Sequence, residues 1–353
     1  MSPTLAAAGR TPEHDRRLAE HGGALALARV AAVHRGTLEL VTDDGPRPGF
    51  VTGKLRHAAL TALDLPSVGD WVAHDPESGA VHAVLERTSA LVRAARDGRE
   101  PQVLAANVDL VVVVASLTRE LNVGRIERML TLAADAPADA LVVLSKADLD
   151  PDPAARVAEV RAAIGGAAPV LPVSTVDGSG IEAVGALLGP GVTGVLLGAS
   201  GVGKTTLLNR LAGGDRATAP TRDADDRGRH TTTWRELVAL AGGGVVIDTP
   251  GLKLPRIWEQ ASGLASVFSD IEELAKACRF ADCRHAGEPG CAVAEALADG
   301  RLTPERLAAQ EQLAREEAWA ASRRDERARR ERKERTRRVH REQKRIQKAK
   351  GRR

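Results

Sequence analysis

The residues best suited to chemistry form a Walker A phosphate-binding pattern in this 353-residue chain. An apolar run precedes the pattern and leucines at helical spacing follow it, which is the strand, loop and helix context that the motif requires. Glycines let backbone N–H groups turn toward phosphate oxygens, and the helix N-terminus adds its positive dipole end. This context argues against a chance glycine-rich turn. The predicted phosphate-contacting residues are Gly198, Ala199, Ser200, Gly201, Val202, Gly203, Lys204, Thr205 and Thr206.

Specific roles are predicted for two side chains of this loop and for a turn that lies further along the chain. Lys204 is expected to bridge the β- and γ-phosphates of a nucleoside triphosphate, and the Thr205 hydroxyl is placed to bind Mg²⁺. The segment Asp248 to Gly251 ends another apolar run. Alone it is an ordinary turn sequence, but beside a Walker A loop Asp248 is expected to hold the water shell of Mg²⁺ and Gly251 to offer its N–H to the γ-phosphate. Leu252 follows and cannot hydrogen-bond an attacking water, so another group must orient it.

The segment Gly228 to Thr233 lies between these two elements, after a charged stretch. We predict that Thr232 closes over Mg²⁺ and the γ-phosphate, as a switch segment does when it orders around a triphosphate. His230 is the nearest titratable group that can position the attacking water. A solvent-facing loop histidine is the other interpretation, and the sequence leaves both open.

A candidate base-reading loop comes before the phosphate loop in the chain, at the end of the apolar run Leu141 to Leu144. Asp148 can accept hydrogen bonds from the N1 and N2 donors of guanine, with the stem of Lys146 along the ring. Ser174 ends another apolar segment and is expected to contact the base through its backbone. Because base reading precedes phosphate binding, the order indicates a circularly permuted GTPase domain. The base-reading residues are Ser145, Lys146, Ala147 and Asp148.

All three cysteines of the chain fall within fourteen residues and share that stretch with one histidine. Three thiols and one imidazole are the ligands of a tetrahedral Zn²⁺ site, and four protein ligands leave no open position for catalysis. A disulfide framework would leave one thiol unpaired. We therefore predict one structural zinc ion, whose binding is coupled to local folding. Its ligands are Cys278, Cys283, His285 and Cys291.

These motifs together resemble one family, the ribosome small-subunit-dependent GTPase A proteins, over most of the chain. The resemblance rests on the phosphate loop, the two switch segments and the cysteine pattern already described, and on Gly69-Asp70-Trp71-Val72 and Asn107-Val108-Asp109. It implies an N-terminal OB-fold barrel, a permuted P-loop GTPase domain and a C-terminal zinc-binding domain, hence a multidomain α/β protein. It also implies GTP hydrolysis stimulated by the small ribosomal subunit, with His230 as a catalytic residue. Ser145 departs from the commoner asparagine, which leaves the affinity for the nucleotide open.

Charge is distributed unevenly along the chain. The whole chain carries a net charge of +3, but residues 323–353 hold 17 Lys or Arg against 5 Asp or Glu, a net of +12. A basic tail beside an acidic body points to a polyanionic partner, here the small subunit and its rRNA. A solvated charged helix is the alternative. Membrane attachment is disfavoured because the tail has almost no apolar face.

Composition and spacing suggest five regions. They are a disordered leader over residues 1–21, an RNA-binding barrel over 22–93, the GTPase domain over 94–260, a zinc-binding domain over 261–322 and a basic RNA-binding tail over 323–353. No targeting signal or apolar run long enough to span a membrane is evident, so we expect a cytoplasmic protein, acting as a monomer. With the family resemblance, the prediction is a GTPase of late small-subunit maturation. Two alternatives stay open: an RNA-binding assembly chaperone with structural nucleotide binding, and an ATPase.

Overall fold

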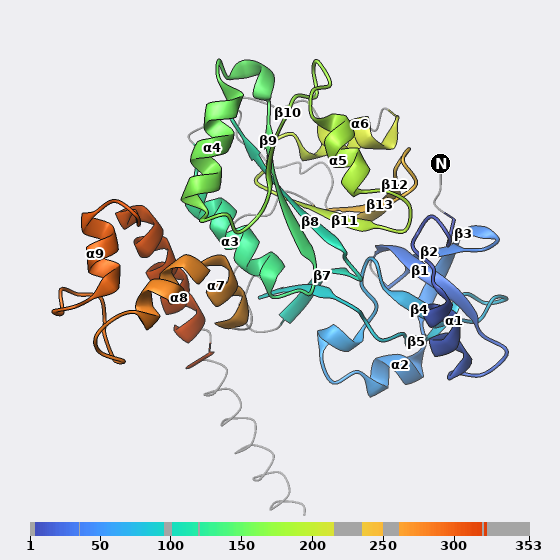
Figure 1. The fold of residues 1–353 in the computed structure, drawn as a ribbon. Helices are drawn as coiled ribbons and strands as arrows, with labels where there is room; N and C mark the ends of the chain where they lie inside the picture. Colours follow the sequence, from blue (N-terminus) through green and yellow to red (C-terminus); the bar gives the residue numbers. More distant parts are fainter. Residues whose placement is uncertain are drawn as a thin grey trace, which may run out of the picture.

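One continuous sheet of eleven strands joins the N-terminal and central parts of the chain, in the order β10-β9-β8-β11-β13-β12-β1-β2-β3-β5-β4. The computed structural model describes residues 4–34, 36–94, 101–118, 121–214, 235–249, 261–319 and 321–322. A barrel lies at one end of the central α/β domain and a group of helices at the other (Figure 1). The multidomain α/β architecture predicted from the sequence is confirmed.

The central part of the sheet holds six strands. Five of them are parallel, and β12 is antiparallel to its neighbour β13. Strands β8, β9 and β10 follow one another outward in the sheet, and β11 then lies on the other side of β8. The crevice at the carboxyl ends of the strands therefore opens between β8 and β11. The strands are β8 (Leu110–Ser116), β9 (Asp139–Ser145), β10 (Val170–Val173), β11 (Thr193–Leu197), β12 (Glu236–Ala239) and β13 (Val245–Asp248).

Helices cover both faces of this sheet, which explains why its strands are apolar at nearly every position. Val111 and Val113 of β8 pack in the same core as α3 and α4, whereas Val112 and Val114 pack with α5 and α6. The helices are α3 (Val123–Ala134), α4 (Pro153–Ala163), α5 (Ile181–Leu187) and α6 (Lys204–Ala212), with the short 3₁₀ helix η2 (Ala147–Leu149) after β9.

Five strands form the N-terminal barrel, closed by the pairing of β1 with β4. Strand β1 also pairs with β12, at Ala32 and Glu236, and this pairing makes the barrel sheet continuous with the central one. A hairpin of β6 and β7 follows the barrel. The elements are β1 (Ala26–Val33), β2 (Leu38–Thr42), β3 (Gly45–Val51), α2 (Gly53–Ala58), η1 (Ala62–Asp64), β4 (Trp71–His74), β5 (Ala80–Val84), β6 (Ala90–Ala94) and β7 (Pro101–Ala106).

A buried arginine of β1 fastens the barrel to the central domain. The guanidinium of Arg29 donates to the Thr193 hydroxyl at 2.9 Å and to the Asn107 carbonyl at 3.2 Å, and it also donates to the carbonyls of Gly69 and Ala8. Burial lowers the pKa of Arg29 to about 10, so it stays protonated at neutral pH. The strand that leads into the phosphate loop is therefore tied directly to the barrel, because Thr193 begins β11.

The expected disorder of residues 1–21 is not what the structure shows for residues 4–21. Leu5 and Ala8 are buried in the main core, and α1 (Pro12–Ala19) packs on the barrel, with the His14 ring 4.3 Å from that of Trp71. The leader is short in apolar residues, but Leu5 and Ala8 are buried and Leu18 packs against the same core. Composition could not reveal this, because order here depends on the surface that receives the segment.

We expect the packing of α1 to weaken below neutral pH. His14 Nδ1 accepts a hydrogen bond from the Thr11 N–H at 3.0 Å, which requires an unprotonated nitrogen. Burial, then the charges of Arg29 and Arg17, lower the pKa of His14 below its usual value of 6.5. Because the pKa of His14 is lower in the folded than in the unfolded protein, His14 contributes fully to the free energy of unfolding above pH 6.5. This contribution declines as the pH falls from 6.5 through the folded-state pKa.

Urea unfolding at pH 7.5 and 5.5 tests this expectation. His14→Phe keeps a ring against Trp71 but does not titrate, so it should lose less stability than the parent between the two pH values. Equal losses of unfolding free energy in the two proteins would contradict a role for His14 in the pH dependence of stability.

The C-terminal helices pack against α3. They are α7 (Ala261–Val267), α8 (Ser269–Lys276) and α9 (Ala292–Ala298), and a further helical segment covers residues 304–319. Within the described ranges, none of the helices has the length and apolarity that crossing a bilayer would demand.

Candidate functional site

The phosphate loop connects β11 to α6 at the carboxyl edge of the sheet. Gly201 and Gly203 have φ values of 80° and 93°, a region that L side chains rarely adopt, so glycine is required for the turn. A Cβ on Gly198 would lie 2.5 Å from the Val114 carbonyl oxygen, which leaves no room for a side chain. Thr205 and Thr206 lie in the first turn of α6, where backbone N–H groups lack partners within the helix. The loop therefore has the shape and the donors of an anion cradle.

Lys204 is held inside this cradle. Its side chain is buried, and Nζ donates to the Gly198 and Ala199 carbonyls, both at 2.9 Å. Burial lowers the pKa of Lys204 to about 8, and the negative charge of Asp248 opposes that shift. At neutral pH the ammonium is therefore charged and close to its loop, where a bound polyphosphate would stabilise it further.

Asp248 comes to the same edge from the neighbouring strand. It ends β13 and lies opposite Leu196 of β11 in the strand register. The next residue, Thr249, is buried and donates its hydroxyl to the Leu196 carbonyl at 2.6 Å. This bond fixes the end of β13 against the strand that carries the phosphate loop. Asp248 is thus close enough to Lys204 to act on its pKa.

The base-reading loop lies beside the phosphate loop. Ser145 ends β9, and its hydroxyl donates to the Val202 carbonyl of the phosphate loop at 2.6 Å, with the Ala115 carbonyl at 3.0 Å. Lys146, the next residue, has φ of 60°, which turns the chain sharply after the strand. Segments 57 residues apart in sequence are therefore in direct contact at one edge of the sheet.

Asp148 is positioned by a serine from the adjacent strand end. The Ser174 hydroxyl lies 2.6 Å from Asp148 Oδ1. The predicted backbone contact of Ser174 with the base stays a prediction, and the structure adds that the side chain of Ser174 holds the aspartate. Sequence reasoning missed this pairing, since a serine after an apolar run carries no signal of its partner.

Several predicted residues lie outside the described part of the chain. They are His230, Thr232, Gly251, Leu252 and the basic tail over residues 323–353. The remaining predicted nucleotide residues gather at the carboxyl edge of the sheet, as β8, β9, β10, β11 and β13 are parallel.

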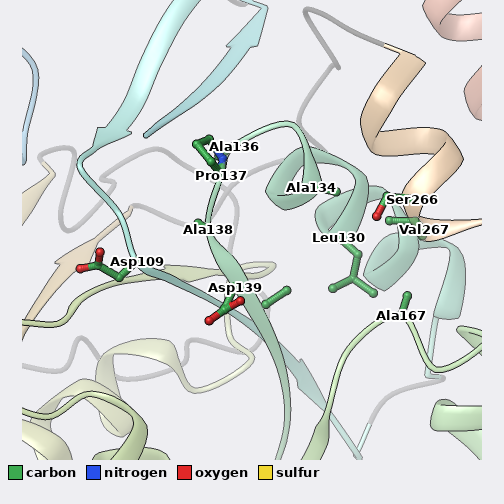
Figure 2. A pocket seen from close by; sticks show the side chains of 11 residues that line it. Asp109, Leu130, Ala134, Ala136, Pro137, Ala138, Asp139, Ala167, Ser266 and Val267 are labelled. Carbon is green, nitrogen blue, oxygen red and sulfur yellow. The ribbon is translucent and has the colours of Figure 1, made fainter. Parts of the chain in front are cut away.

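A cavity lies at the opposite edge of the sheet and is not part of this site. It has a volume of about 530 Å³ and opens between α3, α7 and the first residues of β8 and β9 (Figure 2). Asp109 and Asp139 line it, together with Leu130, Ser266 and Val267. Asp109 precedes β8 and Asp139 begins β9, and both strands end at the nucleotide loops, so the strand length separates this cavity from those loops.

The four predicted metal ligands form one cluster. Cys278 Sγ lies 3.9 Å from Cys291 Sγ and 3.7 Å from His285 Nδ1, and Cys291 Sγ lies 3.5 Å from the same nitrogen. The candidate atoms of all four residues, including Cys283, lie within 4.8 Å of one another. Metal–sulfur bonds of about 2.3 Å and metal–nitrogen bonds of about 2.0 Å at tetrahedral angles give edges close to these separations. The cluster can hold one metal ion.

Arg306 joins α8, the helix that precedes the metal cluster, to the central domain. This buried guanidinium binds both carboxylate oxygens of Asp270 on α8, at 2.6 and 2.7 Å, and Glu127 of α3 at 2.8 Å. It also lies over the Phe268 ring. Burial raises the pKa of Glu127 to about 7, and Arg306 opposes the shift. No sequence motif predicts the buried contacts of Arg306, because its partners come from three separate segments.

Known proteins resemble the chain closely. A model of the RsgA GTPase family matches residues 84–258. A protein of Opitutus terrae named small ribosomal subunit biogenesis GTPase RsgA is 48% identical over 313 residues, covering 84% of this chain and 85% of that protein. A Streptomyces avermitilis protein of the same name is 45% identical, covering 86% of this chain and 82% of that protein.

Solved structures give the same result. YjeQ from Thermotoga maritima matches with a TM-score of 0.60 at 28% identity, covering 82% of this chain and 97% of that one. YloQ, described as a circularly permuted GTPase, matches with a TM-score of 0.57 at 26% identity, covering 82% of this chain and 94% of that one. The description of YloQ as circularly permuted agrees with the motif order of this chain. The chain belongs to the RsgA family of GTPases.

Proposed function

We propose that the chain hydrolyses GTP during late maturation of the small ribosomal subunit, to which it binds through rRNA. The contact between Ser145 and Val202 carries the nucleotide part of this proposal, since it brings the base-reading and phosphate loops to one edge. The names of the relatives support the subunit as partner. We place the protein in the cytoplasm and expect it to act as a monomer, with the GTPase domain over residues 94–260.

Catalysis in this proposal is mainly electrostatic. Lys204 and the loop N–H groups stabilise charge on the transferred phosphoryl group, and His230 orients the attacking water. Gly251 offers its N–H to the γ-phosphate. Thr205, Asp248 and Thr232 supply the hydroxyl and carboxylate oxygens that Mg²⁺ prefers, and the ion would offset charge on the β- and γ-phosphates. Leu252 supplies no polar group, so we expect slow hydrolysis without the ribosomal subunit.

Phosphate release with small subunits, large subunits or no ribosomes tests the proposal. We expect stimulation by small subunits only. A rate that small subunits leave unchanged would favour an RNA-binding assembly chaperone with structural nucleotide binding. Competition of GTP binding by ATP separates a GTPase from an ATPase, because Asp148 should reject adenine, whose matching ring positions offer no equivalent pair of donors.

RNA contact is assigned to two basic regions. On the barrel, Lys54 and Arg56 are exposed on α2, and they suit phosphate contacts better than base stacking. The tail over residues 323–353 supplies the larger positive charge. Deleting the tail should therefore weaken subunit binding and reduce its dependence on salt, measured by sedimentation with subunits at several ionic strengths.

We assign the metal cluster to one structural Zn²⁺, because three thiolates and one imidazole suit this ion. Replacing Cys291, which also accepts the Ala294 N–H at the start of α9, should release the metal and unfold the segment between α8 and α9. Apparent binding free energies of about 10–16 kcal/mol are typical of structural zinc sites in small peptides, so the expected loss of local structure is complete. Zinc content and hydrogen exchange of residues 277–298 measure it.

Arg284→Ala is the matched control for Cys291→Ser. Arg284 lies on the same loop, but its side chain is not among the ligands, so zinc content should stay near one per chain. Full zinc content in Cys291→Ser would contradict the assignment.

A further inference from the structure

We propose that Ser145 fixes the phosphate loop and donates no hydrogen bond to the base, so that base selection is left to the predicted contacts of Asp148, which Ser174 holds. The inference rests on the proposed function and specifies how its nucleotide is recognised. It predicts that the other edge of guanine, where N7 and O6 are acceptors, receives no hydrogen bond from Ser145.

The argument begins with the single proton of the Ser145 hydroxyl. Both hydrogen-bond partners of that hydroxyl are backbone carbonyls, the Val202 oxygen at 2.6 Å and the Ala115 oxygen at 3.0 Å. A carbonyl only accepts, so the hydroxyl must be the donor, and a hydroxyl has one proton to donate. The proton is thus committed to protein atoms. The side chain is 3% exposed and closely packed there.

No proton of this side chain remains for the base. N7 and O6 of guanine both need donors, and a side-chain amide at position 145 would carry two. Serine has neither the second proton nor the reach. We infer that N7 receives no hydrogen bond from Ser145, and that this residue acts on the nucleotide only through the position of the phosphate loop.

Asp148 is equipped to carry the selection. The Ser174 hydroxyl accepts from the N–H groups of Val176 and Asp177, at 3.1 and 3.3 Å, which leaves its own proton for Asp148 Oδ1 at 2.6 Å. Asp148 is exposed, unlike the buried Ser174. Its carboxylate is therefore fixed in direction and still has lone pairs for the two guanine donors.

The experiment compares GTP with 7-deaza-GTP, in which a C–H group replaces the N7 acceptor. Dissociation constants are measured by displacement of a fluorescent GDP from the full-length protein. We expect the two nucleotides to bind equally, within about twofold. Binding of 7-deaza-GTP that is tenfold weaker would overturn the inference and leave the proposed function intact. Absence of binding by either nucleotide would overturn both.

Variants separate loop positioning from base reading. Ser145→Ala leaves the Val202 carbonyl without its donor, so the affinities for GTP, GDP and 7-deaza-GTP should all fall by about tenfold, with an unchanged ratio between them. Ser145→Thr keeps a hydroxyl and should restore most of the affinity. A loss of affinity for GTP and GDP that spares 7-deaza-GTP would identify Ser145 as a base-reading residue and overturn the inference.

Two controls complete the design. Ser116 is paired with Ser145 in the strand register and is also buried, but its hydroxyl bonds Thr118 and not the phosphate loop. Ser116→Ala should leave all three affinities unchanged. Asp148→Asn should lower the affinity for GTP at least tenfold and raise that for xanthosine triphosphate, whose ring presents a carbonyl in place of the N2 amine. An unchanged preference in Asp148→Asn would contradict selection by Asp148.

Discussion

Lys204→Ala is expected to reduce GTP hydrolysis on small subunits by about a hundredfold or more, because removing one preorganised donor to transition-state charge typically costs about 10²–10³ in rate. Lys204 is the one ammonium held inside the described phosphate loop, with Nζ at 2.9 Å from two of its carbonyls. Its loss removes the positive charge and leaves those carbonyls without a donor. Single-turnover phosphate release with saturating GTP measures the effect on chemistry separately from binding.

Lys276→Ala is the control for this variant. Lys276 ends α8 and is exposed, so its removal changes the net charge equally without touching the nucleotide loops. Its rate should match that of the parent protein. If Lys204→Ala retained the full stimulated rate, the assignment of the catalytic site would be wrong.

Arg306→Met is expected to destabilise the packing of the C-terminal helices on α3 by about 3–5 kcal/mol, the usual cost of removing one partner from a buried ion pair. The variant leaves Glu127, which is 2% exposed, and Asp270 without their cation. Methionine keeps much of the volume, so the loss reports mainly on charge and hydrogen bonds. Hydrogen exchange of residues 304–319 measures the local opening without assuming that the whole chain unfolds in one step.

Arg315→Met provides a comparison on the same helical segment. Arg315 is largely exposed and lies 3.8 Å from Glu311, a geometry worth at most about 1 kcal/mol. Its protection from exchange should stay near that of the parent. Adding Glu127→Gln to Arg306→Met should recover part of the lost protection, since the second change removes the unpaired charge. Equal protection in the Arg306 and Arg315 variants would show that the buried network does not hold the helices.

The arrangement gives Arg306 an indirect connection to the nucleotide site. Glu127 lies on α3, and the first turns of the same helix line a small cavity with Ala199 and Val202 of the phosphate loop. One helix thus carries a partner of Arg306 and lies beside the phosphate loop. The barrel has a second connection, through Arg29 and the start of β11.

The motifs that sequence alone determined are those whose parts are adjacent in the chain. The phosphate loop needs only glycines at fixed offsets between a strand and a helix, and the metal cluster needs four ligands within fourteen residues. The permuted order and the α/β architecture followed from the same local patterns. In each of these features the chemistry is set by short-range spacing, which a sequence displays directly.

Tertiary structure decided the contacts between residues far apart in the chain. The Ser145 bond to Val202, the Ser174 bond to Asp148 and the Arg306 network join segments 57, 26 and up to 179 residues apart, and the order of the leader depends on the barrel surface beneath it. A serine or arginine has the same appearance in a sequence whether it faces water or a buried carbonyl. Only the folded chain sets the partner, because hydrogen bonding and desolvation depend on which groups share one volume.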